Sequence, residues 1–122
     1  MKLPVSFQVL GAALVVAALP AAAHHGWGGQ ATEQFDLTGV VETPVSLAGP
    51  HATMKIRAEG KVWDITLAPS NRTAAAGLTE ATLPVGAEVT VSGHRNRDAN
   101  RFEIKTERVT YNGKLYDVYP GR

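Results

Sequence analysis

Hydrophobic and polar residues alternate with a period of two along much of the chain from Gln34 onward, a pattern typical of half-buried β-strands. The alternation is clearest over 51–58. There the residues expected to face inward are Ala52, Met54 and Ile56. Glu59-Gly60 follows as a tight turn, and 61–67 continues as the next strand. The pattern therefore predicts a hairpin of two antiparallel strands.

The same reasoning predicts further strands at 35–43, 88–94, 101–111 and 114–119. Gly39 inside the first of them indicates a bend or a bulge. Phe102 and Ile104 share one parity, whereas Val109 and Tyr111 fit the same face only after a shift, so a bulge is expected near 105–108. Asn112-Gly113 predicts a type I′ hairpin turn before the last strand.

The alternation stops after Leu67, and Ser70 can cap a short helix over 71–76 that ends at Gly77. Three strands, a short helix and two or three further strands follow the order of an OB-like barrel. We therefore expect an all-β protein with little helix, a five- to six-stranded OB-like β-barrel over 35–122 with its one short helix between strands 3 and 4. A small sandwich or an open sheet is the alternative.

Residues 1–23 have the pattern of a secretory signal peptide. Lys2 precedes an apolar stretch over 5–19, Pro20 ends it, and Ala21 and Ala23 form an A-x-A cleavage site. A membrane anchor is the alternative, but a stretch of about 15 apolar residues is shorter than the roughly 20 that span a bilayer. We expect cleavage after Ala23, a periplasmic protein, and no membrane contact after cleavage.

The segment 24–34 contains glycines at 26, 28 and 29 and is expected to be flexible unless contacts tie it down. The whole chain has 12 Lys and Arg against 11 Asp and Glu, and loss of Lys2 makes the two equal. This balance argues against a nucleic-acid partner. The chain contains no cysteine, so a metal site would use histidine, carboxylates, backbone groups or the terminal amine.

Several short motifs occur in a fixed order along the chain. They are His24-His25, Phe35-Asp36, Gly39-Val40-Val41, Pro50-His51-Ala52, Trp63, Gly77-Leu78, 86–93 with a glycine at each end, and Arg97-Asp98. Their order resembles a family of small exported bacterial proteins of unknown function. The resemblance implies a fold and no activity. Gly49 stands where that family usually has asparagine, so any role of that amide is absent from this chain.

The four histidines suggest metal chemistry. If His24 becomes the first residue, its amine and imidazole can chelate one ion, and His51 can add a third nitrogen. His25 offers a second mode, together with the amine and the intervening amide. Copper binds imidazole nitrogen well and stands highest in the divalent affinity order. We therefore predict a copper ion held by His24, His25 and His51, with the role of His94 left open.

No arrangement of nucleophile and base is recognisable, so we do not expect an enzyme. The expected function is metal carriage, buffering or sensing in the periplasm, and a periplasmic protein partner is left open. The histidine pair can equally be a solvated terminus, and His51 can simply complete a turn. The alternative function is a metal-free OB-like module that binds a protein, a small ligand or an envelope component. Trp27 is expected either to cover the metal site or to pack over the barrel end.

Overall fold

Six β-strands and one short helix are present among residues 2–4, 11 and 26–122, the part of the chain that this computed structural model describes. The elements in chain order are β1 (Phe35–Ser46), β2 (His51–Ala58), β3 (Lys61–Pro69), α2 (Ser70–Ala75), β4 (Glu88–Arg95), β5 (Glu103–Tyr111) and β6 (Lys114–Asp117). Within these described residues, no helix has the length and apolar character needed to cross a bilayer.

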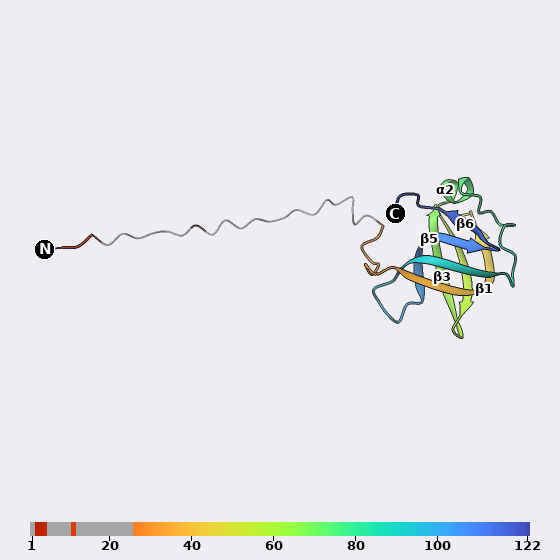
Figure 1. Cartoon of the computed structure of the whole chain (residues 1–122), viewed down its shortest axis with the longest axis horizontal. Coiled ribbons are helices and arrows are strands. Elements are labelled where there is room, and N and C mark those ends of the chain that lie inside the picture. The colour runs from red at the N-terminus through yellow and green to blue at the C-terminus, as the bar shows by residue number, and fades with distance from the viewer. Residues whose placement is uncertain (1, 5–10, 12–25) are drawn as a thin grey trace.

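The sheet closes on itself to form a five-stranded barrel (Figure 1). β1 pairs antiparallel with both β2 and β4. β2 then pairs with β3, and β4 pairs with β5. A parallel pairing of β3 with the start of β5 completes the circle. β6 pairs with the end of β5, on the same edge as β3 and opposite β4. The predicted all-β barrel with one helix between the third and fourth strands is confirmed, and closure excludes an open sheet.

β1 serves both halves of the barrel because it changes partner along its length. Residues 35–40 pair with β4, whereas the strand from Val40 onward pairs with β2. Gly39 lies at the crossover, where a Cβ atom would be only 2.6 Å from the carbonyl oxygen of Arg57. The predicted bend at this glycine is thus explained by the close approach of two backbones.

The expected bulge in the fifth strand is present at Glu107. Gly93 of β4 pairs with Thr106, but the preceding Ser92 pairs with Arg108, so Glu107 is the extra residue. The bulge changes which side chains face inward, and Lys105, Thr106 and Glu107 are all buried. Two ionisable side chains are therefore carried into the end of the barrel.

The barrel interior is filled mainly by inward-facing strand residues, together with Leu78 and Leu83 from the connection between α2 and β4. The largest fully buried side chains are Trp63, Met54, Ile56, Ile65, Leu67, Leu78, Leu83 and Ile104. Burying such side chains stabilises a fold by roughly 1.5–3 kcal/mol each before conformational entropy is subtracted. The core therefore accounts for the stability of a domain that has no cysteine to form a disulfide.

The boundaries of β2 agree with the sequence prediction, whereas β1, β3 and β4 extend further and β5 and β6 are shorter. The prediction that Ser70 caps the helix is wrong. Pro69 occupies the cap position without a side-chain hydrogen bond, and the Ser70 hydroxyl instead donates to the carbonyl oxygen of Gly49. The helix start is thereby tied to the loop before β2. Gly77 follows the helix with φ +98°, as a helix end favours.

Candidate functional site

A cavity of about 550 Å³ opens at the end of the barrel where β2 begins and β3 passes into α2. The residues that line it include Gly26, Trp27, His51, Arg72, Lys105 and Tyr119. His51 is the first residue of β2, pairs with Pro69 and is exposed. The volume lies in the range of small-molecule sites in proteins.

His24 and His25, the other predicted metal ligands, lie outside the described residues. The residues that directly follow them, Gly26 and Trp27, line the same cavity as His51. No group of three or more histidine, aspartate or glutamate residues suited to a metal occurs among the described residues. A metal site at His51 would therefore need ligands from the preceding histidine pair.

Residues 26–31 are held against the end of β4 by backbone hydrogen bonds. The amide of Ala31 donates to the carbonyl of Arg95 at 2.8 Å, and the amide of Arg97 donates to the carbonyl of Gly29 at 2.9 Å. The side-chain amide of Gln30 also donates to the carbonyl of His94 at 3.0 Å. These bonds supply the ties that a segment rich in glycine requires to be ordered.

Trp27 packs over the barrel end and also lines the cavity. Its ring makes edge contacts with Tyr119 and His94, at centroid distances of 5.2 and 5.7 Å. The Arg122 guanidinium lies 3.8 Å from the ring centroid and the Lys105 ammonium 4.8 Å from it. Attraction between these cations and the ring face helps to fix its position.

Lys105 is the most unusual charged group at the cavity because it is only 8% exposed. Its ammonium donates a hydrogen bond to the carbonyl oxygen of Gly26. Burial and then the nearby Arg122 lower the pKa of Lys105, and Glu103 opposes them. Burial likewise raises the pKa of Tyr119, against the effect of Arg72 and Arg122.

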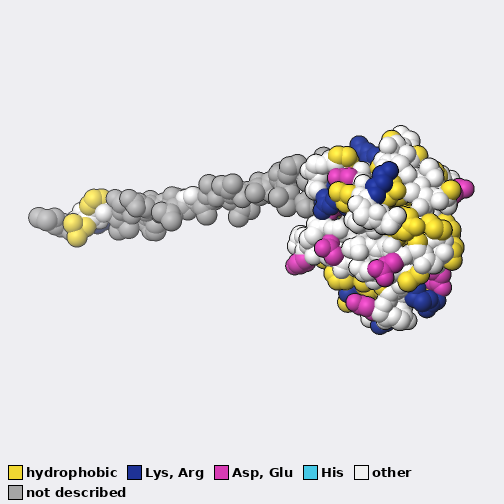
Figure 2. Space-filling model, turned by 45° about the vertical axis from the view of Figure 1, so that its right-hand side comes forward, with side chains coloured by type: hydrophobic (Ala, Val, Ile, Leu, Met, Phe, Trp, Pro, Cys, Tyr) yellow, Lys and Arg dark blue, Asp and Glu magenta, His cyan; other side chains and the backbone are white. Residues whose placement is uncertain are grey.

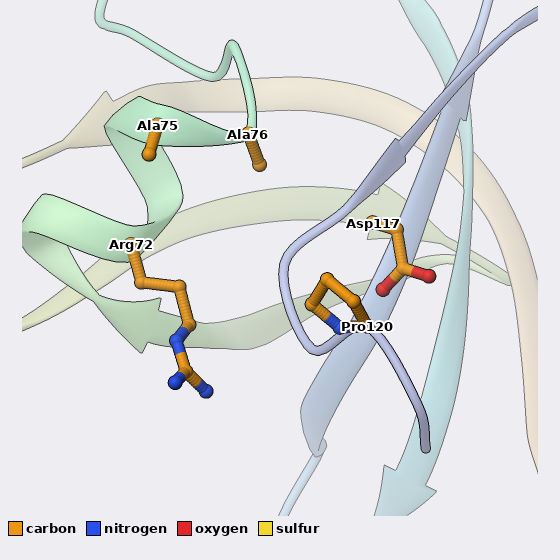
Figure 3. A pocket seen from close by; sticks show the side chains of 5 residues that line it. All are labelled: Arg72, Ala75, Ala76, Asp117 and Pro120. Atoms are coloured by element: carbon orange, nitrogen blue, oxygen red, sulfur yellow. The ribbon is translucent and has the colours of Figure 1, made fainter.

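Arg72 reaches from α2 and borders two cavities. Figure 3 shows the second, of about 350 Å³, with Arg72 on one side and Pro120 and Asp117 on the other. The guanidinium lies 5.7 Å from the ring centroid of Tyr119. In the part of the chain that the structure describes, neither Arg72 nor Lys105 has a carboxylate within the 4.0 Å of an ion pair.

His94 borders a different cavity, and both of its ring nitrogens contact other residues of the chain. Its Nδ1 lies 3.0 Å from the carbonyl oxygen of Ala31, and its Nε2 lies 3.4 Å from a carboxylate oxygen of Glu107. Glu107 also accepts a hydrogen bond from Gln34 and lies 3.4 Å from the Arg122 guanidinium. Both ring nitrogens of His94 thus face oxygens of the chain, which gives this histidine a structural role.

Sequence reasoning placed His51 at a strand mouth and missed Arg72, Lys105 and Tyr119. The parity change over 105–108 was the available signal for Lys105, since a bulge can turn a polar side chain inward. Arg72 and Tyr119 carried no local signal. Figure 2 shows Lys and Arg side chains at both the upper and the lower end of this face of the barrel.

Comparison with known proteins finds a matching family and a similar fold, and neither match shows an activity. The sequence pattern described as "Family of unknown function (DUF6152)" matches residues 12–105. The crystal structure of the ZRD-deleted mutant of TiaS in complex with agmatine is similar, with a TM-score of 0.52 and 16% identity over 70% of this chain and 26% of that chain. A complex of TiaS with a transfer RNA, AMPCPP and agmatine has a TM-score of 0.48 and 18% identity over 65% of this chain and 18% of that chain.

The chain thus spans about a quarter or less of these solved chains, and the likeness concerns the fold alone. No curated protein matches the chain.

Proposed function

The chain belongs to the family of unknown function DUF6152, and from its own residues we propose that it is an exported periplasmic protein that binds one copper ion. The proposed ligands are His24, as both amine and imidazole, with His51 and in a second mode His25. The domain that carries them would be an OB-like barrel, and the role would be metal carriage, buffering or sensing.

One observation carries this proposal: Gly26 and Trp27 share a cavity with His51. Neighbouring Cα atoms of a chain are about 3.8 Å apart, so the histidine pair is covalently attached to a wall of that cavity. His51 is exposed and lines the cavity, which would leave its ring accessible to an ion.

The positive lining of the cavity sets a condition on the metal. Lys105 and Arg72 oppose a bare cation through charge repulsion. Binding would therefore depend on coordination by neutral nitrogen, which favours copper over ions such as Ca²⁺ that depend on oxygen ligands. Imidazole must also lose its proton to ligate, so the affinity should fall below about pH 6.

The test is a calorimetric titration with copper of the protein that begins at His24. We expect one tight site, and loss of at least about tenfold in affinity in His24→Ala and in His51→Ala, since each removes one nitrogen ligand. A matched protein with extra residues before His24 lacks the free amine and should also bind weakly. Equal and weak binding by all four proteins would contradict the proposal.

A second candidate is a metal-free periplasmic module that binds a protein, a small ligand or an envelope component. Val40 and Val62 favour it, because they are 42% and 37% exposed and stand on either side of Arg57 on the outer face of the barrel. Residues added before His24 would remove an amine-based metal site and leave such a surface unchanged. The same extended protein therefore separates the two functions.

A further inference from the structure

We propose that the cavity at His51 also binds an oxyanion, a carboxylate or phosphate group of a small molecule, between Arg72 of α2 and Lys105 of β5. This ligand class lies beyond the metal function. The groups that would hold the oxyanion are cations and neutral hydrogen-bond donors, none of which is a proposed metal ligand. The oxyanion site therefore stands on its own.

The first argument is charge without a partner. Neither Arg72 nor Lys105 is in an ion pair within the described residues. Residues 1–25 contain no aspartate or glutamate, so the rest of the chain has no carboxylate side chain to offer. Glu103 acts on Lys105 only from a distance, and its carboxylate accepts a hydrogen bond from Asn96 at 3.2 Å.

The second argument is the cost of burying Lys105. A buried ammonium is unfavourable unless it is paired and hydrogen-bonded. Lys105 has three N–H donors, and Gly26 accepts from it. Burial and Arg122 already lower its pKa, which indicates that the charge is incompletely compensated. An oxyanion in the cavity would supply the missing charge and further acceptors.

The third argument is the geometry of the walls. The Arg72 guanidinium lies over the ring of Tyr119, and no hydrogen bond links its N–H groups to another described residue. The side-chain oxygen of Asn71 accepts from the Arg72 amide at 2.9 Å, which leaves the Asn71 NH₂ group for a ligand. Trp27 and Tyr119, 5.2 Å apart, form an aromatic wall for the body of the molecule.

The experiment is an NMR titration of the protein that begins at His24, after metal is removed on a chelating resin. The probes are inorganic phosphate and succinate, with chloride at matched ionic strength as the control. We expect saturable shifts at Trp27, Arg72 and Tyr119 with the oxyanions and not with chloride. Response to phosphate alone or to succinate alone identifies which source the site accepts.

Arg72→Gln is the decisive variant, because Arg72 is exposed and its loss leaves the core intact. We expect it to weaken oxyanion binding at least about tenfold, the effect of losing a charge-assisted hydrogen bond. Arg57→Gln is the matched control, since Arg57 is paired with Glu42 and does not line the cavity. Equal affinity in the two variants, or an equal response to chloride, would overturn the proposal.

The protein with extra residues before His24 separates this proposal from the metal function. If the extended and the unextended protein both bind phosphate and neither binds copper, the copper site alone is rejected. Tight copper binding by the unextended protein without a response to either oxyanion rejects the oxyanion site alone.

Discussion

Two glycines, Gly39 and Gly93, allow neighbouring strands to approach more closely than a residue with a Cβ atom would permit. At Gly93 a Cβ atom would overlap with the carbonyl oxygen of Lys105 and lie 2.8 Å from the Cα atom of Thr106. This contact sits beside the Glu107 bulge, where β5 turns Lys105 inward. A single residue without a side chain in β4 is therefore a condition for the position of the cavity's buried lysine.

Gly93→Ala should destabilise the protein by about 1–3 kcal/mol or more, because rigid backbone atoms of β5 must move. Urea unfolding followed by circular dichroism measures the change. Gly29→Ala is the matched control, since a Cβ atom there meets nothing within 4 Å, and it should change the free energy of unfolding by less than about 0.5 kcal/mol. Similar losses in both variants would show that the close approach at Gly93 is unimportant.

At the scale of elements, residues 26–31 behave as an added piece of chain docked on the end of β4. Their backbone bonds to Arg95 and Arg97 fix the direction, and Trp27 provides the side-chain contacts. This docking brings the wall formed by Gly26 and Trp27 to His51. Both proposed ligand sites depend on it.

Trp27→Ala should release this segment while leaving the barrel folded. We expect hydrogen exchange at the amides of Ala31 and Arg97 to accelerate by at least about tenfold, because loss of the aromatic and cation contacts lowers the local opening free energy. Amides inside the barrel strands should stay protected. Leu115→Ala, at a position 57% exposed on β6, is the control and should change neither set. Unchanged exchange at Ala31 and Arg97 would mean that backbone bonds alone hold the segment.

At the scale of the whole molecule, the buried Lys105 and the partly buried Tyr119 make stability depend on alkaline pH in opposite directions. The folded pKa of Lys105 lies below 10.5, so the unfolded chain binds more protons between the two values and stability rises with pH there. The folded pKa of Tyr119 lies above 10.0, so the native state keeps its proton longer and stability falls as pH rises above 10.0.

Urea unfolding between about pH 8 and about pH 11 can separate these contributions. Lys105→Met should remove the rise below pH 10.5, and Tyr119→Phe should remove the fall above pH 10.0. Each variant serves as the control for the other, because the two changes of slope have opposite sign. A Lys105→Met variant with the parental slope would show that the ammonium is not disfavoured in the folded protein.

Much of the fold could be predicted from the sequence because it follows from local rules. Alternation located β2 with its observed boundaries, and the Glu59-Gly60 and Asn112-Gly113 turns both have the positive φ angles that such hairpins require. The change of parity along β5 indicated its bulge. Helix capping was predicted wrongly, because Pro69 takes the cap position and the Ser70 hydroxyl donates to Gly49, a partner 21 residues away that no local rule indicates.

The cavity is different, because its walls come from parts of the chain that meet only after the barrel closes. The sequence by itself determined the strands, the turns and the position of His51 at the start of one of them. Only the tertiary structure placed Trp27, Arg72, Lys105 and Tyr119 around that histidine. Periodicity reports which face of an element is apolar, whereas long-range partners are selected by barrel closure, as when β3 pairs with β5.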